Sequence, residues 1–196
     1  MTNEEVSFRA KQHICSNLKE LMQHKSFSKI TVSELTKKCN INRNTFYYHF
    51  EDIYAALKWM FEQEAIEIVK QYDLLLDYEE VVSFVYDYIT GNSYIINCAY
   101  DSLGRDVLKR FFYKDFRSII EANIREHEKN LNITVTDDFR NFIATLYTEG
   151  LAGMLINLAQ NPKNYQKEQL GSYFRILIHT TIPSLIKGFD EENRIK

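Results

Sequence analysis

The sequence predicts an all-α protein of about nine helices. Apolar residues recur at the three- and four-residue spacing of a helix face along nearly the whole chain, and no segment alternates as a strand does. Only six glycines and two prolines occur in 196 residues, whereas average usage would make these two residues about 12% of a chain. The first of them is Gly91, so no phosphate-binding Gly-rich loop and no dinucleotide-binding fingerprint precedes it.

Charge is distributed unevenly along the chain. Residues 1–50 hold eight Lys and Arg against four acidic residues, whereas residues 51–196 hold 16 basic and 23 acidic residues. A small basic segment before a larger acidic one suggests that the first segment meets a polyanion. Chance clustering of solvated charge is the alternative.

The cysteine content and the N-terminal residues indicate in which cellular compartment the protein is expected. Cys15, Cys39 and Cys98 form no CxxC pair and no even set, so neither a disulfide framework nor a zinc ribbon is indicated. The first residues lack an apolar signal region, and no uninterrupted apolar run is long enough for a membrane span. We therefore expect a cytoplasmic protein without a metal or cofactor.

Three helices are predicted in the first 50 residues. The first covers residues 5–24, and the second follows Thr31, a capping residue with Glu34 at the capping-box position. Asn40 can adopt the left-handed conformation that ends this helix, and Asn42 can cap the next one. Two short helices joined by such a turn and braced by a longer one form a helix-turn-helix.

The rest of the chain predicts a connecting helix and a helical body. The connecting helix runs from Asp52 to about Tyr72. Gly91, Gly104 and the Asn161-Pro162 pair separate the helices that follow. These helices are expected near residues 79–90, 93–101, 105–130, 136–160 and 166–187.

The third short helix offers a polar and aromatic face. On a helical wheel of 100° per residue, Phe46 and Phe50 fall on one side and Asn44 and Tyr48 on the other. Arg can bond guanine and Asn can bond adenine through two hydrogen bonds in the major groove. Arg43 lies on the packed side by angle, but it stands in the first turn, which a recognition helix inserts into the groove. The DNA-binding residues predicted from this face and from the lysines of the preceding helix are Lys37, Lys38, Arg43, Asn44, Thr45, Tyr47, Tyr48 and His49.

The stretch ITVSELTKKCNINRNTFYYHFEDIYAAL resembles the DNA-binding signature of the TetR family of bacterial transcription regulators. The resemblance covers about residues 5–72 and rests on the run TFYYHF. It implies that Thr31 and Ser33 approach the DNA backbone and a base edge, and that residues 43–45 read bases. It also implies that Tyr47, Tyr48 and His49 contact phosphates or thymine methyl groups. The segments FFYKDF and GLAGMLINL resemble the subgroup that includes activators of dihydroxyacetone kinase operons.

Two departures from the family pattern concern the same region. The usual glycine of the turn is replaced by Asn40. The family often has Lys after the Phe of the run and at the start of the next helix, where this chain has Glu51 and Ile53. Backbone contacts from those two positions are therefore missing or replaced.

The last two predicted helices carry apolar stripes suited to a second copy of the chain. Small residues let helix backbones approach closely, although packing within one chain is the alternative. The predicted dimer contacts are Phe142, Leu146, Gly150, Gly153, Ile156, Phe174, Leu177 and Ile178.

A ligand site is expected in the body, between the connecting helix and the helix that starts near Arg105. Residues 53–130 hold 14 of the 27 aromatic residues, and ligand sites are mostly apolar and aromatic with a few polar groups. Core packing is the alternative for each of them. The predicted ligand residues are Trp59, Tyr86, Tyr100, Phe112, Phe116 and His127.

Together these observations predict a regulator with a helix-turn-helix domain at residues 1–51 and a helical ligand-binding and dimerisation domain at residues 52–196. We expect a homodimer on a palindromic double-stranded operator, responsive to a small molecule and repressing transcription, the commoner habit of the family. The alternatives are an activator of the same family and a helical interaction adaptor that does not bind DNA. An enzyme is disfavoured, because no Glu-x-x-His pair, HExxH or GxSxG motif occurs.

Overall fold

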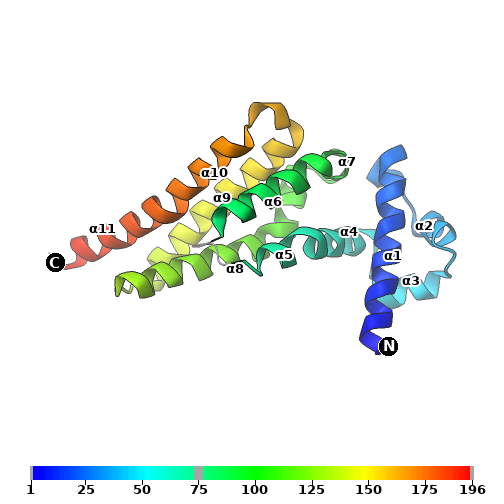
Figure 1. Cartoon of the computed structure of the whole chain (residues 1–196). Coiled ribbons are helices and arrows are strands. Elements are labelled where there is room, and N and C mark those ends of the chain that lie inside the picture. The colour runs from blue at the N-terminus through cyan, green and yellow to red at the C-terminus, as the bar shows by residue number, and fades with distance from the viewer. Residues whose placement is uncertain (1, 73–76, 195–196) are drawn as a thin grey trace. The chain divides into compact units, whose positions relative to one another are not determined.

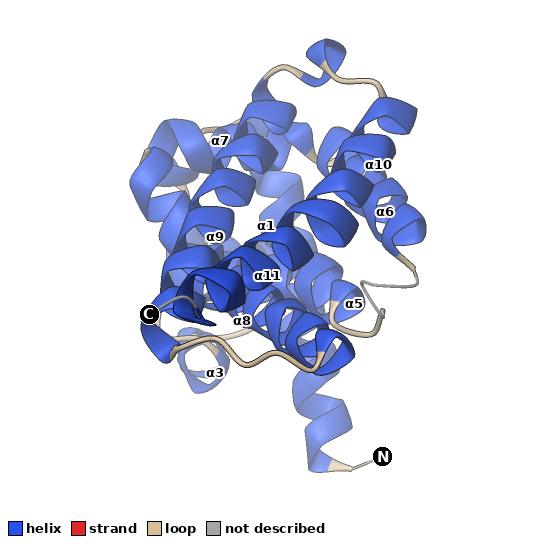
Figure 2. Cartoon of the chain, turned by 90° about the vertical axis from the view of Figure 1, so that its left-hand side faces the viewer, coloured by secondary structure: helices blue, strands red, loops and turns tan. Residues whose placement is uncertain are grey.

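Every element is helical in the part of the chain that the structure describes (Figures 1 and 2). The computed structural model describes residues 2–72 and 77–194, except for the side chains of residues 111 and 112. The all-α class is therefore confirmed. Packing divides the chain into an N-terminal unit, Met1–Ile68 with Asn92–Leu108, and a C-terminal unit, Val69–Gly91 with Lys109–Lys196. The predicted boundary after residue 51 divides a DNA-binding domain from a ligand-binding and dimerisation domain, and it stays a prediction.

The elements follow the predicted order closely. The first five are α1 (Asn3–His24), a 3₁₀ turn (Phe27–Lys29), α2 (Val32–Lys38), α3 (Arg43–His49) and α4 (Ile53–Phe61). Next come α5 (Glu67–Val69), α6 (Tyr78–Gly91), α7 (Ser93–Leu103) and α8 (Arg105–Leu131). The chain ends with α9 (Asp137–Gln160), α10 (Lys167–Ile176) and α11 (Ile182–Arg194).

Two of the predicted helices contain a π-helical turn. One turn, Glu62–Ile66, joins α4 to α5, and the other, Leu177–Thr181, joins α10 to α11. In each turn a backbone N–H reaches the carbonyl five residues earlier, so the side chains after the turn are rotated relative to a regular helix. The last helical segment also extends to Arg194 rather than ending near residue 187.

The N-terminal unit has a dense apolar core that includes part of the predicted body. Its fully buried side chains come from α1, α2, α3 and α4, and include Ile14, Leu18, Leu35, Phe46 and Leu57. Helix α7 packs on α1 and on the 3₁₀ turn. Gln23 Nε2 donates to Tyr94 Oη at 3.1 Å, and Ser28 N–H donates to Ser102 Oγ at 3.2 Å. Helix α7 was expected in the body, but packing places it in the N-terminal unit.

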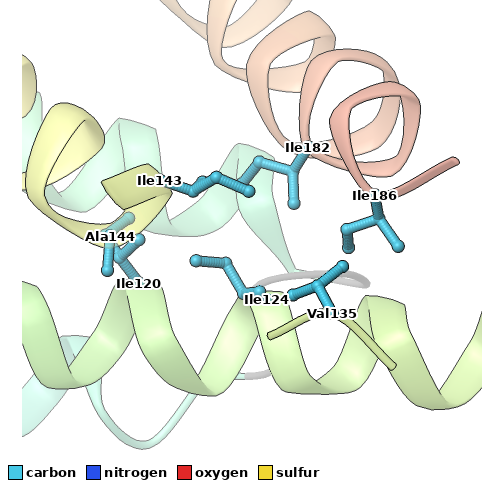
Figure 3. Close-up of a cluster of buried hydrophobic side chains, with 7 residues drawn as sticks. All are labelled: Ile120, Ile124, Val135, Ile143, Ala144, Ile182 and Ile186. Carbon is cyan, nitrogen blue, oxygen red and sulfur yellow. The ribbon is translucent and has the colours of Figure 1, made fainter. Parts of the chain in front are cut away.

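The C-terminal unit is organised around a cluster contributed by three helices and one loop (Figure 3). The members of this cluster are buried and aliphatic. They are Ile120 and Ile124 of α8, Val135 of the loop, Ile143 and Ala144 of α9, and Ile182 and Ile186 of α11. The rings of Phe139 and Phe189 stack beside it at 4.4 Å between centroids. The last helix is thus fixed to the α8–α9 pair by apolar burial.

The reversal between α8 and α9 rests on a left-handed asparagine. Asn132 has φ 53°. Its N–H bonds the carbonyl of Lys129 at 3.2 Å, and the next N–H, of Ile133, bonds the carbonyl of Glu128 at 3.0 Å. This is the Schellman pattern, which satisfies the last free carbonyls of a helix. Asparagine tolerates the conformation better than other residues with a Cβ.

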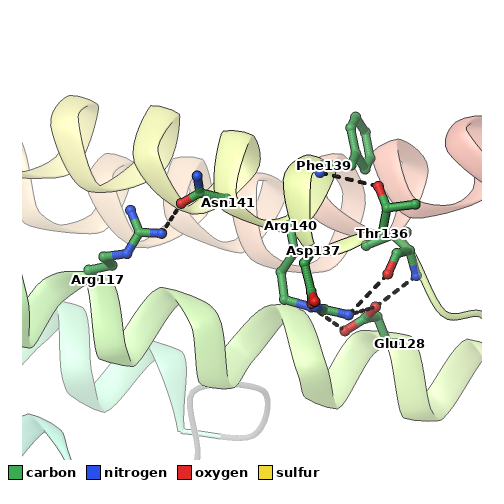
Figure 4. Close-up of polar contacts among 8 residues, drawn as sticks. Arg117, Glu128, Thr136, Asp137, Phe139, Arg140 and Asn141 are labelled. Atoms are coloured by element: carbon green, nitrogen blue, oxygen red, sulfur yellow. Dashed lines mark hydrogen bonds and ion pairs between the residues drawn. The ribbon is translucent and has the colours of Figure 1, made fainter.

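A buried ion pair joins the same two helices (Figure 4). The guanidinium of Arg140 donates from Nε to Glu128 Oε2 at 3.0 Å and from Nη2 to Glu128 Oε1 at 2.9 Å. Glu128 also accepts from the N–H of Val135 at 2.9 Å, and Arg140 donates to the carbonyl of Val135 at 3.1 Å. Every charge in this buried network therefore has a partner, which buried ions require.

Replacing Arg140 with Leu should lower the free energy of unfolding by about 3–5 kcal/mol, because the carboxylate of Glu128 would be left buried and unpaired. Arg194→Leu is the matched control, because Arg194 pairs with Asp190 at the surface, and exposed pairs contribute about 0–1 kcal/mol. Urea unfolding followed by circular dichroism measures both. Equal losses for the two variants would contradict the role assigned to the buried pair.

Acid should remove part of the stability that Glu128 supplies. Burial alone raises the pKa of Glu128, but hydrogen bonds from Arg140 and from the Val135 N–H outweigh it and hold the pKa below its usual value. The stabilisation is therefore complete above the unfolded-state pKa of about 4.3 and is lost as the pH falls through the folded-state value. In urea titrations, the stability difference between wild type and Glu128→Gln should shrink below about pH 4. A difference that stays constant with pH would contradict this account.

Candidate nucleic-acid interface

Helix α3 is held by its buried aromatic side. Phe46 is fully buried and Phe50 is 5% exposed, and their ring centroids lie 6.0 Å apart. Phe50 also meets Trp59 of α4 edge-on at 5.9 Å. The ammonium group of Lys11 lies over the rings of Phe50 and Trp59 at 5.7 and 5.6 Å. These contacts fix which side of α3 remains at the surface.

The turn before α3 has the predicted conformation. Asn40 has φ 54°, its N–H bonds the carbonyl of Lys37 at 3.2 Å, and the N–H of Ile41 bonds the carbonyl of Thr36 at 3.0 Å. This is the same Schellman pattern as at the end of α8. Asn42 then caps α3, because its Oδ1 accepts from the N–H of Thr45 at 2.7 Å. The substitution of the usual glycine by Asn40 thus leaves the turn geometry intact.

Four side chains of α3 are exposed: Arg43, Asn44, Tyr47 and Tyr48. Tyr48 is the most exposed large hydrophobic residue of the described chain, at 82%. Arg43 Nη2 donates to Tyr47 Oη at 3.4 Å, and its guanidinium lies 5.9 Å from the centre of the same ring. Tyr47 therefore orients Arg43 outward, although the helical wheel placed Arg43 on the packed side.

Thr45 and His49 are less available than predicted. The hydroxyl of Thr45 donates to Asn42 Oδ1 at 3.0 Å, so it is used within the helix cap. His49 is half-buried, and its Nδ1 lies 3.4 Å from the hydroxyl of Ser7 in α1. Burial, and then the charge of Lys11, lower the pKa of His49. The ring is therefore neutral near pH 7. Sequence reasoning missed the contact with Ser7, because nothing local links residues 42 positions apart.

Helix α2 presents the remaining predicted residues. Thr31 and Ser33 are exposed at its start, and Thr31 Oγ1 accepts the N–H of Glu34 at 3.2 Å. Lys37 is exposed and has no ion-pair partner in the part of the chain that the structure describes. Lys38 pairs instead with Glu20 of α1 at 2.7 Å. Among the two lysines, Lys37 is thus the free cation.

The predicted ligand residues are divided between the two units. Trp59 and Tyr100 belong to the N-terminal unit, where Trp59 also meets Phe8 edge-on at 5.5 Å. Aromatic packing therefore accounts for Trp59 without a ligand. Tyr86, Phe116 and His127 belong to the C-terminal unit. The side chain of Phe112 lies outside the described residues.

The predicted dimer residues have mixed exposure. Phe142 and Leu146 are 63% and 56% exposed, and Gly150 is exposed beside them on α9. Ile156 is only 5% exposed, so it packs within the chain, which is the alternative stated for this stripe. Gly153, Phe174, Leu177 and Ile178 are half-buried. On α10 and α11 the exposed large hydrophobic residues are Tyr173, Ile176 and Leu185, which the sequence did not predict.

The described residues include all three cysteines and other side chains of the types that hold metals. No group of three His, Cys, Asp or Glu side chains is placed to hold a metal within them. Burial raises the pKa of Cys15 to about 12 and that of Cys39 to about 11, so neither thiol is a ready nucleophile near pH 7. The organised polar surface that remains is the exposed face of α3 with the start of α2.

Comparisons with known proteins agree with this arrangement. The family model described as bacterial regulatory proteins, tetR family, matches residues 14–55, which contain α2 and α3. A second model, described as a transcriptional regulator C-terminal region, matches residues 77–180, more than half of the chain.

Two relatives carry similar names. The HTH-type dhaKLM operon transcriptional activator DhaS of Lactococcus lactis subsp. lactis (strain IL1403) is 22% identical over 141 residues, which cover 72% of this chain and 74% of the relative. A solved structure named Dihydroxyacetone kinase operon activator DhaS has a TM-score of 0.66 and 20% identity, and covers 92% of this chain and 97% of its own. That likeness shows the shared fold. The two family models identify the chain as a member of the TetR family of bacterial transcriptional regulators.

Proposed function

We propose that this regulator binds double-stranded DNA by placing α3 in the major groove. The observation that carries the proposal is the exposed set Arg43, Asn44, Tyr47 and Tyr48, backed by buried Phe46 and Phe50. Such a face offers donors, acceptors and aromatic edges on a helix whose opposite side is anchored. The assignment makes the protein a non-enzymatic DNA-binding regulator of the cytoplasm.

Roles follow from the chemistry of each group. Arg43 suits the guanine edge, which accepts two hydrogen bonds in the major groove. Asn44 suits the adenine edge, which accepts one hydrogen bond and donates another. Lys37, Thr31 and Ser33 suit phosphates, which position the protein without reading sequence. Tyr48 suits a phosphate or a thymine methyl group. His49 and Lys38 contribute less, because they already have partners in α1.

The protein acts as a homodimer in this proposal. Helix α9 is the one helix of the described chain that is long and apolar enough to cross a membrane by length and composition. In a water-soluble dimer, the apolar composition of α9 has two causes. One side of the helix is buried within the chain, and the exposed side chains Phe142 and Leu146 would contact the second copy. A two-fold dimer presents two recognition helices about one DNA turn apart, or a multiple of it, so the operator is an inverted repeat.

The direction of regulation depends on where the operator lies relative to the promoter. Repression is the expectation from the family, and activation is what the names of both relatives state of those proteins. In either case we propose that a small molecule bound in the C-terminal unit changes operator affinity, and that operator binding changes ligand affinity equally. Selection of bound duplexes from a random pool, followed by a reporter carrying the selected site, tests DNA binding and then its direction.

Arg43→Ala or Asn44→Ala should weaken operator binding by about 1–3 kcal/mol and relax selectivity at one base position in each half-site, because base-edge hydrogen bonds are lost. Binding to random DNA should change little. Gel shifts on selected and scrambled duplexes measure both quantities. Equal losses on the two duplexes would contradict base reading.

Lys37→Ala should weaken operator and random DNA alike and reduce the slope of log affinity against log salt by about one, because one phosphate contact is lost. Lys38→Ala should have a smaller effect, since Lys38 is paired with Glu20. Lys163→Ala, a change of an exposed lysine in the C-terminal unit, is the control and should leave affinity unchanged. A larger effect of Lys38→Ala than of Lys37→Ala would contradict the assignment of Lys37 as the phosphate contact.

Leu146→Glu should convert the dimer to a folded monomer, because it places a charge at the proposed contact while the side chain is exposed in the single chain. Val6→Glu, at an apolar side chain of similar exposure in α1, should leave the dimer intact. Sedimentation velocity at micromolar protein measures the mass. A wild type that sediments as a monomer would contradict the dimer.

A further inference from the structure

Tyr47 contacts the guanidinium group of Arg43 in two ways. Its hydroxyl oxygen accepts from Arg43 Nη2 at 3.4 Å, and the guanidinium carbon lies 5.9 Å from the centre of its ring. The second distance is within the range of cation–π pairs. The two residues are four apart, so they are neighbours on the helix surface. Because helical side chains lean toward the N-terminus, the ring of Tyr47 reaches back over the turn that carries Arg43.

Tyr47 is itself held by the core of the N-terminal unit. Its ring meets the ring of Phe46 edge-on, with 5.5 Å between centroids and 84° between planes, and Phe46 is fully buried. A tyrosine side chain has only two rotatable bonds, whereas arginine loses much rotamer freedom when it is immobilised. A series of contacts thus leads from the core through Phe46 and Tyr47 to Arg43. It restricts the guanidinium group before any DNA is bound.

The partner of Arg43 is uncharged. In the part of the chain that the structure describes, Arg43 contacts the Tyr47 side chain and pairs with no carboxylate, whereas Lys25 and Lys38 pair with glutamates. A carboxylate would offset the positive charge of Arg43, and a hydroxyl does not. The contact uses one of the five N–H groups of the guanidinium, and the guanine edge needs two of them. Tyr47 therefore orients Arg43 and leaves its charge and enough donors for DNA.

A fixed guanidinium affects selectivity more than affinity. Guanine is recognised when two N–H groups reach its O6 and N7 together. A guanidinium that rotates freely can turn to a phosphate instead, and such a contact carries no sequence information. A guanidinium that is already oriented also loses less conformational freedom when it binds. The contact with Tyr47 should therefore strengthen the preference for guanine over other bases.

We propose that Tyr47 is a positioning residue, which holds Arg43 for the reading of guanine and thereby determines selectivity at that base pair. This inference rests on the proposed function, in which Arg43 contacts a base edge in the major groove. It gives Tyr47 a role different from the direct contact with a phosphate or a thymine methyl group that the family resemblance implies.

The test removes the hydroxyl of Tyr47 and keeps its ring, in the full-length variant Tyr47→Phe. The ring can still pack on Phe46, so the variant should fold, which circular dichroism checks. Tyr54→Phe is the matched control. Tyr54 and Tyr47 are 46% and 47% exposed, and Tyr54 meets Phe27 edge-on at 5.3 Å. Within the described residues the Tyr54 hydroxyl bonds no other group, so its loss should change neither affinity nor selectivity.

Binding is measured on the selected operator, on a scrambled duplex and on operators with one base pair changed at a time. Arg43→Ala identifies the base pair that Arg43 reads. Tyr47→Phe should lower the preference for guanine at that base pair by about two- to tenfold. Preferences at other positions and binding to the scrambled duplex should not change. In the Arg43→Ala background, Tyr47→Phe should have no further effect, which a double-mutant cycle measures.

Three results would overturn the proposal. Equal weakening of operator and scrambled duplex by Tyr47→Phe would show that the hydroxyl contacts a phosphate. The same loss of selectivity with and without Arg43 would show that Tyr47 acts on the base directly. Selectivity that Arg43→Ala loses and Tyr47→Phe retains would overturn this inference alone. If Arg43→Ala retains full selectivity, base reading by Arg43 is contradicted as well.

The contact is also tested without DNA. Nitrogen-15 relaxation of the Arg43 Nε–H in the free protein reports how far this group moves on the picosecond to nanosecond timescale. The heteronuclear Overhauser effect should be lower in Tyr47→Phe than in wild type and Tyr54→Phe. Equal values in the three proteins would overturn the proposal, even if wild type bound no selected duplex.

Discussion

The burial of Phe46 and Phe50 in the N-terminal unit is the constraint on which the DNA-binding surface depends. Helix α3 has only seven residues, and isolated helices of fewer than about 12 residues are marginal in water. Burying one Phe side chain contributes about 1.5–3 kcal/mol, so two of them on one side outweigh the weakness of the short helix. The same burial determines which residues face outward, since a helix with one anchored side cannot rotate freely.

Ion pairs within the N-terminal unit limit the number of basic side chains that are left to contact DNA. Several of its basic residues are already engaged, because Lys19 pairs with Glu64, Lys25 with Glu34 and Lys38 with Glu20. Lys11 lies over aromatic rings. The positive charge left for a polyanion is therefore smaller than composition suggests, and it includes Lys37 and Arg43. This favours an interface that depends on shape and base contacts more than on charge alone.

The C-terminal unit combines a rigid frame with unsatisfied polar groups. The α8–α9 reversal is held by Asn132 and by the pair of Arg140 with Glu128, and α11 is held by the isoleucine cluster. Within this frame, polar side-chain atoms of Asn123, His127 and Thr148 lack protein partners. Buried polar groups without a protein partner are rare in native proteins.

The sequence by itself determined the local structure of this protein and predicted the surface that we propose binds DNA. Asn40, Asn42 and Thr31 adopt the turn and cap conformations predicted for them, because such preferences act over a few residues. The tertiary structure alone decided the placement of α7 in the N-terminal unit, the packing of Trp59 and Ile156, and the π-helical turns. It also decided the isolation of Asn123 and Thr148 from protein partners. These features depend on contacts between residues far apart in the chain. Hydrophobic periodicity cannot predict such contacts, because it indicates that a side chain is buried but not which residues it packs against.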